Sequence, residues 1–360
     1  MSVDTTVRAE LAVRGVRVAA PVFRRGGAGP SDDGHLVVDG LPVAVPLVDD
    51  SPWSVDASGR LVHEGAVPGA GVPDIRVTAV GRPRFYDLAT ADGVPYHRLA
   101  RLHGTDVLAT TVVQTCVRYR EATRCRFCAI EASLAAGATT RVKSPAQLAE
   151  VAAAAVRLDE VRQMVMTTGT AATPDRGARH LARCAAAVRQ AVPGLPIQVQ
   201  CEPPAGPDLG VLGELHAAGA TAVGIHVESL DDAVRRRWTP GKATIPLSDY
   251  WAAWREAVRV FGRNRVSTYL LVGLGEDPDE LVAGAASLVE AGVYPFVVPY
   301  RPLAGTLAAA DGVPAPPPAL LTDVTTRVAA LLRAASMRGT DQGAGCAACG
   351  ACSALATEGA

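Results

Sequence analysis

From about residue 106 onward, short apolar runs alternate with segments that repeat apolar residues at helical spacing. A capping box with proline at the first helical position, Ser144-Pro145-Ala146-Gln147, begins one of these helices, and Asp277-Pro278 begins another. Strands that alternate with helices predict right-handed βαβ units and a parallel sheet. The predicted strands cover 107–113, 164–167, 197–199, 222–227, 267–272 and 296–298. The pattern therefore predicts an α/β fold, a partial (β/α)6 TIM-like barrel over 106–312, with its active site in the loops after the strands.

Two further regions flank the predicted barrel. Residues 1–105 contain short β-type runs broken by Gly, Pro and Asp, which predicts a small β-rich N-terminal domain. A Pro-rich linker and a helix are expected over 313–338, and a Gly/Ala-rich, Cys-rich tail over 339–360. We expect this tail either to fold over the mouth of the barrel or to stay mobile.

The charge balance excludes several classes of protein. The chain holds 35 Lys and Arg against 36 Asp and Glu, so it lacks the basic excess that is typical of nucleic-acid binding. It has no apolar run long enough to span a bilayer, and its N-terminus does not resemble an export signal. We therefore expect a cytoplasmic protein that binds neither nucleic acid nor membrane.

Eight cysteines are distributed unevenly along this chain. In a chain without an export signal, tight groups of cysteines indicate metal sites rather than disulfides. Two lone cysteines, Cys184 and Cys201, stand outside the groups; Cys184 lies on a predicted helix face and is expected in the core, whereas Cys201 ends a strand. The two groups of three are Cys116, Cys125 and Cys128, here called the loop triad, and Cys346, Cys349 and Cys352, here called the tail triad.

The loop triad follows the first predicted barrel strand. Thiolates suit iron–sulfur clusters or zinc, and a four-iron cubane usually takes four cysteines. Three cysteines would leave one iron open to another ligand. The segment Cys125-Arg126-Phe127-Cys128 resembles the radical SAM motif, which has two residues between its last cysteines and an aromatic residue before the last one. The gap between Cys116 and Cys125 holds eight residues rather than three, and a structural zinc site or buried thiols are the alternatives.

The resemblance to the radical SAM superfamily covers about residues 106–310 and is nearest to biotin synthase and lipoyl synthase. It implies a [4Fe-4S] cluster on the loop triad, S-adenosylmethionine as cofactor, and its reductive cleavage to a 5′-deoxyadenosyl radical. It also implies a small-molecule substrate and a flavodoxin or ferredoxin as electron donor. Four arginines of this loop form either a docking patch for the electron donor or a solvated basic surface: Arg118, Arg120, Arg124 and Arg126. The implied cofactor-binding residues are Phe127, Thr168, Gly169, His226, Glu228, Gly273 and Gly275.

The tail triad has ferredoxin-like spacing, which predicts a second Fe–S cluster, with zinc or a disordered tail as alternatives. The strand positions where biotin synthase places cysteines hold Thr or Tyr here, apart from Cys201, and no cysteine precedes Cys116 as in lipoyl synthase. These differences disfavour biotin and lipoyl synthesis.

The whole chain is also similar to a bacterial radical SAM group encoded beside a nitrilase, which implies a small nitrogenous substrate. Two alternatives remain open: a sulfur-inserting synthase of the biotin/lipoyl type, and a zinc-binding or redox-sensing protein without S-adenosylmethionine chemistry. The sequence identifies no residue that acts on the substrate.

Overall fold

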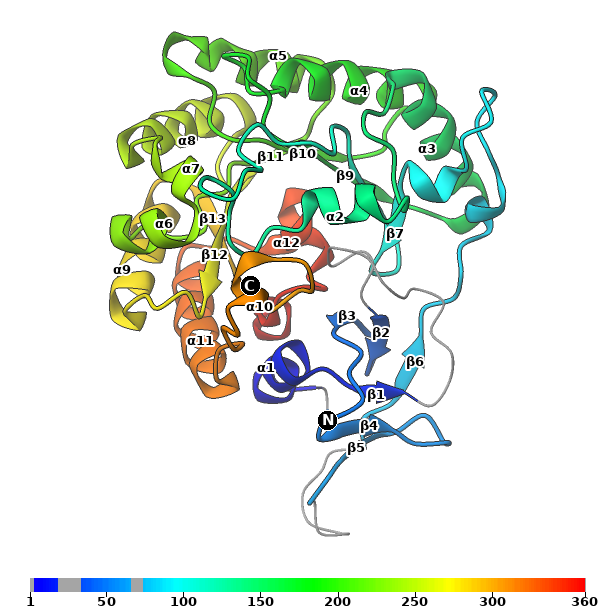
Figure 1. Cartoon of the computed structure of the whole chain (residues 1–360), viewed down its shortest axis with the longest axis vertical. Helices are drawn as coiled ribbons and strands as arrows, with labels where there is room; N and C mark the ends of the chain where they lie inside the picture. The colour runs from blue at the N-terminus through cyan, green and yellow to red at the C-terminus, as the bar shows by residue number, and fades with distance from the viewer. Residues whose placement is uncertain (1–2, 19–33, 66–73, 360) are drawn as a thin grey trace.

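The computed structural model describes residues 3–18, 34–65 and 74–359. Its centre is a curved seven-stranded sheet in the order β13-β12-β11-β10-β9-β8-β7 (Figure 1). Neighbouring strands from β8 to β13 are parallel, and β7 pairs with β8 in the antiparallel direction. The strands are β7 (Arg101–His103), β8 (Val107–Thr111), β9 (Gln163–Thr167), β10 (Ile197–Gln200), β11 (Ala222–Gly224), β12 (Val266–Val272) and β13 (Val293–Pro299).

Helices surround the outside of this sheet, as the alternating pattern predicts (Figure 1). The main ones are α3 (Pro145–Asp159), α4 (Ala178–Ala191), α5 (Val211–Ala217), α8 (Leu247–Phe261), α9 (Pro278–Glu290) and α11 (Pro318–Ala334). Shorter helices are α2 (Ile130–Ala135), α6 (Asp232–Trp238), α7 (Pro240–Ala243), α10 (Leu307–Ala310) and α12 (Cys346–Cys349). The capping box forms at Ser144, and Asp277 caps α9. The predicted α/β partial barrel is therefore confirmed, whereas the added strand β7 was not predicted.

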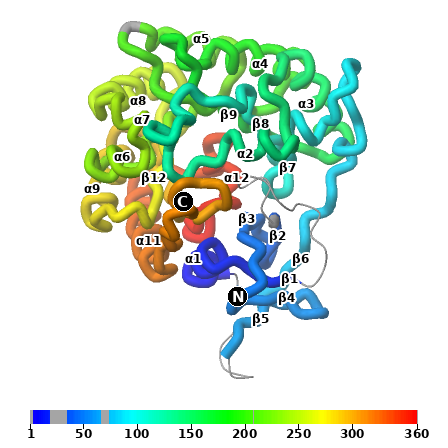
Figure 2. Tube along the Cα trace, in the orientation of Figure 1, coloured from blue at the N-terminus to red at the C-terminus, as the bar shows by residue number. Residues whose placement is uncertain are grey.

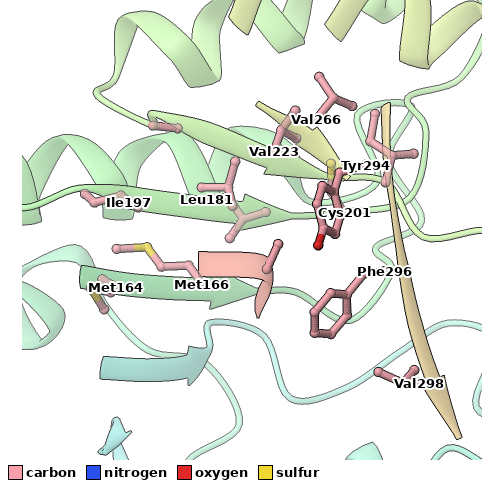
Figure 3. Close-up of a cluster of buried hydrophobic side chains, with 14 of the residues drawn as sticks. Met164, Met166, Leu181, Ile197, Cys201, Val223, Val266, Tyr294, Phe296 and Val298 are labelled. Atoms are coloured by element: carbon pink, nitrogen blue, oxygen red, sulfur yellow. The ribbon is translucent and has the colours of Figure 1, made fainter. Parts of the chain in front are cut away.

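Apolar side chains from successive strands fill the layer between sheet and helices. Figure 3 shows Met164 and Met166 of β9, Ile197 of β10 and Val223 of β11 together with Leu181 of α4. All five are fully buried. Strands covered on both faces need no alternation of apolar and polar residues, which is why they read as continuous apolar runs.

The N-terminal region forms a unit with its own core. It begins with α1 (Thr5–Arg14), a helix that the sequence reading did not predict. Its two three-stranded sheets have the orders β1-β4-β5 and β3-β2-β6. The strands are β1 (Arg17–Val18), β2 (Gly34–Val38), β3 (Leu41–Val45), β4 (Trp53–Val55), β5 (Leu61–His63) and β6 (Val77–Ala79). The separate core of this unit extends to Val77, whereas Phe85, Leu99 and Leu102 pack into the barrel core.

The C-terminal tail enters the barrel at the amino ends of the strands. The backbone N–H of Gly345 donates to Gln163 at the start of β9, and a Cβ on Gly345 would lie 2.2 Å from the Gln198 side chain on β10. Arg265, just before β12, donates to the carbonyl of Gln342. Figure 2 shows this segment within the curve of the chain. The expectation that the tail covers the mouth or stays mobile is wrong, because these contacts hold it at the opposite end.

Candidate metal and cofactor site

The loop that carries the loop triad is fastened to the end of β9. The N–H of Gly169 donates to the carbonyl of Val113 at 2.8 Å, and the N–H of Val117 donates to that of Thr170 at 2.9 Å. The approach is so close that a Cβ on Gly169 would lie 2.1 Å from the Thr115 carbonyl oxygen. Only glycine therefore allows this position of the residue before Cys116.

A buried ion pair supports the same loop from the other side. The Arg118 guanidinium donates to both carboxylate oxygens of Glu202, at distances of 2.9 to 3.1 Å, and also to the carbonyl of Gly241. Arg176 lies 3.8 Å from the same carboxylate. Bidentate pairs of this kind fix geometry as well as charge. Glu202, just after β10, thus positions the loop without belonging to it.

The three thiols of the loop triad are free and partly exposed. The N–H of Cys128 donates to the carbonyl of Cys125, so the last two cysteines share one tight turn. Burial raises the pKa of the Cys128 thiol to about 11 and raises that of Cys125 further, against a lowering effect of the nearby Lys242. Without a bound metal the thiols of Cys125 and Cys128 stay protonated at neutral pH, and a metal would hold them as thiolates.

A cavity of about 520 Å³ lies within the barrel and reaches the loop triad at Cys128, with Phe127 beside it. His226 and Glu228, which follow β11, both line it. The backbone N–H of Tyr269 donates to Nδ1 of His226 at 3.2 Å, so the other nitrogen, Nε2, carries the proton. This Nε2 is buried without a hydrogen-bond partner. It is a donor available to a ligand.

Lys242, from α7, brings a positive charge to this part of the site. Its ammonium group donates to Glu228 at 2.8 Å and to the carbonyl of His226 at 3.1 Å. Burial and Lys242 together lower the pKa of His226 to about 3, so its imidazole is neutral. Glu228 has a left-handed backbone with φ of 71° and still forms a parallel bridge with Leu270 of β12.

The remaining expected cofactor residues are placed differently. Phe127 stacks on Trp238 at 6.5 Å between ring centroids. The Thr168 hydroxyl donates to the Gly169 carbonyl. Gly273 and Gly275 have φ of 103° and 96° in the turn after β12, and they are absent from the cavity lining. A Cβ on Gly273 would meet Pro316 at 2.8 Å, so this glycine packs against the linker.

The four arginines of the loop do not form one uniform surface. Arg118 binds Glu202, Arg126 pairs with Asp311, and Arg124 lies over the ring of Tyr119 at 5.1 Å. Arg120 is exposed.

The tail triad faces the same cavity from the amino ends of the strands, since Cys346, Cys349 and Cys352 all line it. The Cys346 sulfur lies 2.7 Å from the Tyr269 hydroxyl and 3.3 Å from Nε2 of Gln200. The ring of Tyr269 stacks on His226 with centroids 3.9 Å apart. A continuous row of contacts therefore joins the tail triad to His226.

Two lone cysteines belong to neither group. Cys184 is fully buried in α4, as expected. Cys201 is also buried within the core and is not part of the cavity lining. No three His, Cys, Asp or Glu side chains within the described ranges form a site for a single metal ion. The ligands of a four-iron cubane are spaced more widely than those of one ion.

Several residues at the site were not predicted from the sequence as site residues. Lys242 lies on a four-residue helix rather than at a strand end, and Tyr269 and Gln200 lie in strands that read as core. The available signal was β10, in which the polar residues Gln198 and Gln200 alternate with Ile197 and Val199.

Comparison with known proteins now defines the class. Residues 120–288 match the family model described as the Radical SAM superfamily, a span that includes Cys125 and Cys128 and begins after Cys116. The chain therefore contains a Radical SAM domain. No helix in the described part of the chain has the length and hydropathy to cross a membrane. A domain of this superfamily of enzymes implies a [4Fe-4S] cluster and S-adenosylmethionine as cofactors.

Solved structures show similarity at low sequence identity. Methylornithine synthase (PylB) is 15% identical, with a TM-score of 0.42, over 57% of this chain and 56% of that one. HydG, a maturase of the FeFe-hydrogenase, is 14% identical, with a TM-score of 0.46, over 64% of this chain and 49% of that one. HydG from Carboxydothermus hydrogenoformans is 16% identical, with a TM-score of 0.45, over 63% and 50%. The chain thus spans about half the length of these proteins, and no curated protein matches it.

The side chains present fit the implied cofactors. Three free thiols on one loop can serve as soft ligands to a cluster. The unpaired Nε2–H of His226 can donate to a polar group of S-adenosylmethionine, and the Lys242–Glu228 pair supplies one charge of each sign beside it. This donor set suits a zwitterionic ligand that carries hydroxyl groups.

Proposed function

We propose that this protein reductively cleaves S-adenosylmethionine at a [4Fe-4S] cluster held by Cys116, Cys125 and Cys128, and that the radical acts on a small metabolite in the barrel cavity. The observation that carries the proposal is the cavity of about 520 Å³, which meets the loop triad at Cys128. When bound, the cluster would pass one electron to S-adenosylmethionine, which gives methionine and the 5′-deoxyadenosyl radical.

The chain's own residues would hold and orient the cofactor. His226 would donate from Nε2, and Lys242 would hold Glu228 in place beside it. Gly169 would keep the triad loop against the end of β9. Four further residues remain proposed members of the cofactor site: Phe127, Thr168, Gly273 and Gly275. The two glycines would contribute by setting the backbone shape of the turn after β12.

The cavity size and the resemblance together define a class of substrate. The described residues that line the cavity include four with cationic side chains, Arg98, Arg101, Lys143 and Arg301, and a single carboxylate, Glu228. The cavity volume is typical of a small-molecule site. The resemblance to the group encoded beside a nitrilase implies a nitrogenous compound, so we infer a small nitrogenous metabolite as the substrate.

The tail triad supports a second Fe–S cluster at the other end of the same cavity. Its three thiols converge on the lumen, and Gln200 and Tyr269 stand beside Cys346 as hydrogen-bond donors to a thiolate. We propose a flavodoxin or ferredoxin as electron donor, with the exposed Arg120 near its docking surface. The proposed location is the cytoplasm, where such donors and reduced thiols are available.

The test is anaerobic reconstitution with iron and sulfide, followed by iron, sulfide and zinc analysis and by incubation with S-adenosylmethionine and dithionite. We expect about eight irons per chain if both triads hold cubanes, together with 5′-deoxyadenosine and methionine. Cys125→Ala should abolish cleavage and remove about four irons. Cys184→Ala, which changes a cysteine outside both triads, should leave both unchanged. Stoichiometric zinc and no 5′-deoxyadenosine would contradict the proposal.

Sulfur insertion is a second candidate, because the tail triad opens onto the proposed substrate cavity. It predicts that radioactive sulfide introduced at reconstitution leaves the protein in a small-molecule product. The assay adds a metabolite extract, S-adenosylmethionine and a reductant. Sulfide that stays with the protein while 5′-deoxyadenosine accumulates would contradict this candidate.

A further inference from the structure

His103, the last residue of β7, lies directly beside the tail triad. Its Nε2 is 3.4 Å from the Cys352 sulfur, and it lines the cavity together with all three tail cysteines. We propose that His103 is the fourth protein ligand of the tail cluster. This inference rests on the second cluster of the proposed function and names the ligand that its three cysteines leave open.

A second histidine lies against the other ring nitrogen of His103. Nδ1 of His103 lies 3.2 Å from Nε2 of His35, and the two rings meet edge to face at 4.5 Å. When His103 donates its Nδ1–H to His35, its Nε2 keeps a lone pair directed at the triad. Metal-ligating histidines commonly donate their second N–H in this way. His35, which is buried on β2, would therefore be a positioning residue.

The strand that carries His103 is built around the tail. β7 adds to the barrel sheet antiparallel to β8, which places its final residue at the amino ends of the parallel strands. The next residue, Gly104, has φ of 59°, and a Cβ there would lie 3.1 Å from the Cys349 sulfur. A glycine at this turn leaves room for the thiol. Two consecutive residues of this turn thus contact two different cysteines of the triad.

Other polar groups near the triad have a different relation to it. Tyr269 and Gln200 both contact Cys346, and the amide N–H of Gln200 can only donate. His103 instead brings a nitrogen lone pair to Cys352. With this ligand every iron of a cubane would be bound by the protein. Such a cluster would have no open iron with which to chelate the substrate.

The test isolates the tail cluster in the full-length chain. The triple variant Cys116→Ala, Cys125→Ala, Cys128→Ala is reconstituted anaerobically without S-adenosylmethionine and reduced, and the nitrogen-14 coupling of its cluster is measured by pulsed EPR. We expect a directly ligated nitrogen signal that disappears when His103→Cys is added, while the iron content stays the same and the midpoint potential falls. A falling potential is expected because thiolate stabilises oxidised iron more than imidazole does.

Two matched changes complete the design. His63→Ala, in the same N-terminal region but against Trp53, should leave the nitrogen signal unchanged. His35→Ala should retain the iron and shift the coupling, because the tautomer and ring orientation are no longer fixed; an unchanged coupling would overturn its positioning role. A cluster whose nitrogen signal is absent, or survives His103→Cys, overturns the assignment of His103 alone. A triple variant that binds no iron overturns the second cluster itself, and with it this ligand.

Discussion

Gly169 offers the sharpest test of how the triad loop is held. In a Gly169→Ala variant the new Cβ would lie 2.1 Å from the Thr115 oxygen, 2.8 Å from the Thr115 carbonyl carbon and 3.0 Å from the Val113 oxygen. All three neighbours are backbone atoms, so no side-chain rotation can relieve the contact. Thr115 must retreat until that first separation reaches at least 3.0 Å, and Cys116 moves with it.

The cost can be estimated from the contacts that this movement breaks. Two hydrogen bonds fasten the loop here, from Gly169 to Val113 and from Val117 to Thr170. Each contributes about 0.5 to 1.5 kcal/mol, and overpacking adds about 1 to 3 kcal/mol. We therefore expect Gly169→Ala to lower the free energy of unfolding by about 2 to 6 kcal/mol. The barrel should remain folded, because domains of this kind are stable by about 5 to 15 kcal/mol.

The assay combines denaturant unfolding with iron content and the EPR response to S-adenosylmethionine. We expect the folded variant to lose most of the responsive cluster, since its first ligand is displaced. Gly213→Ala is the control, because this glycine lies in α5 with no atom within 4 Å of the added Cβ. It should stabilise the protein by about 0.5 to 1 kcal/mol and leave the cluster intact. Unchanged stability and a full cluster in Gly169→Ala would refute the reasoning.

Three further predictions concern the surroundings of the two triads. Burial lowers the pKa of His226 from 6.5 to about 3, so the unfolded chain takes up a proton below pH 6.5 that the folded protein does not. The free energy of unfolding of the wild type should therefore fall relative to that of His226→Gln as the pH falls, by about 2 kcal/mol at pH 5. Urea titrations at several pH values measure this difference. Arg118→Lys loses the bidentate pair with Glu202 and should lower the free energy of unfolding by about 1.5 to 3 kcal/mol, as measured by thermal unfolding. A smaller loss of stability in Glu202→Gln would argue against the importance of this pair. Gly345→Ala would press a Cβ within 2.2 Å of Gln198, so limited proteolysis should remove the tail faster than in wild type.

Much of the architecture is local in origin and could be predicted. The apolar runs, the capping box at Ser144 and the cap at Asp277 each depend on residues close in sequence, and the structure bears them out. The helix α1 was missed because its residues, from Thr5 to Arg14, carry little apolar periodicity. Strand β7 was missed because three residues are too few to show a pattern.

The sequence by itself determined that three thiols lie on one loop after the first parallel strand, because a tight spacing forces cysteines together whatever the remainder of the chain does. It did not determine where the tail triad lies. That position depends on contacts such as Gly345 with Gln163 and Cys352 with His103, which join residues 182 and 249 positions apart. Contacts of this range follow from the shape of the packed barrel, where a glycine backbone fits against Gln198. Only the tertiary structure could therefore bring both triads to one cavity.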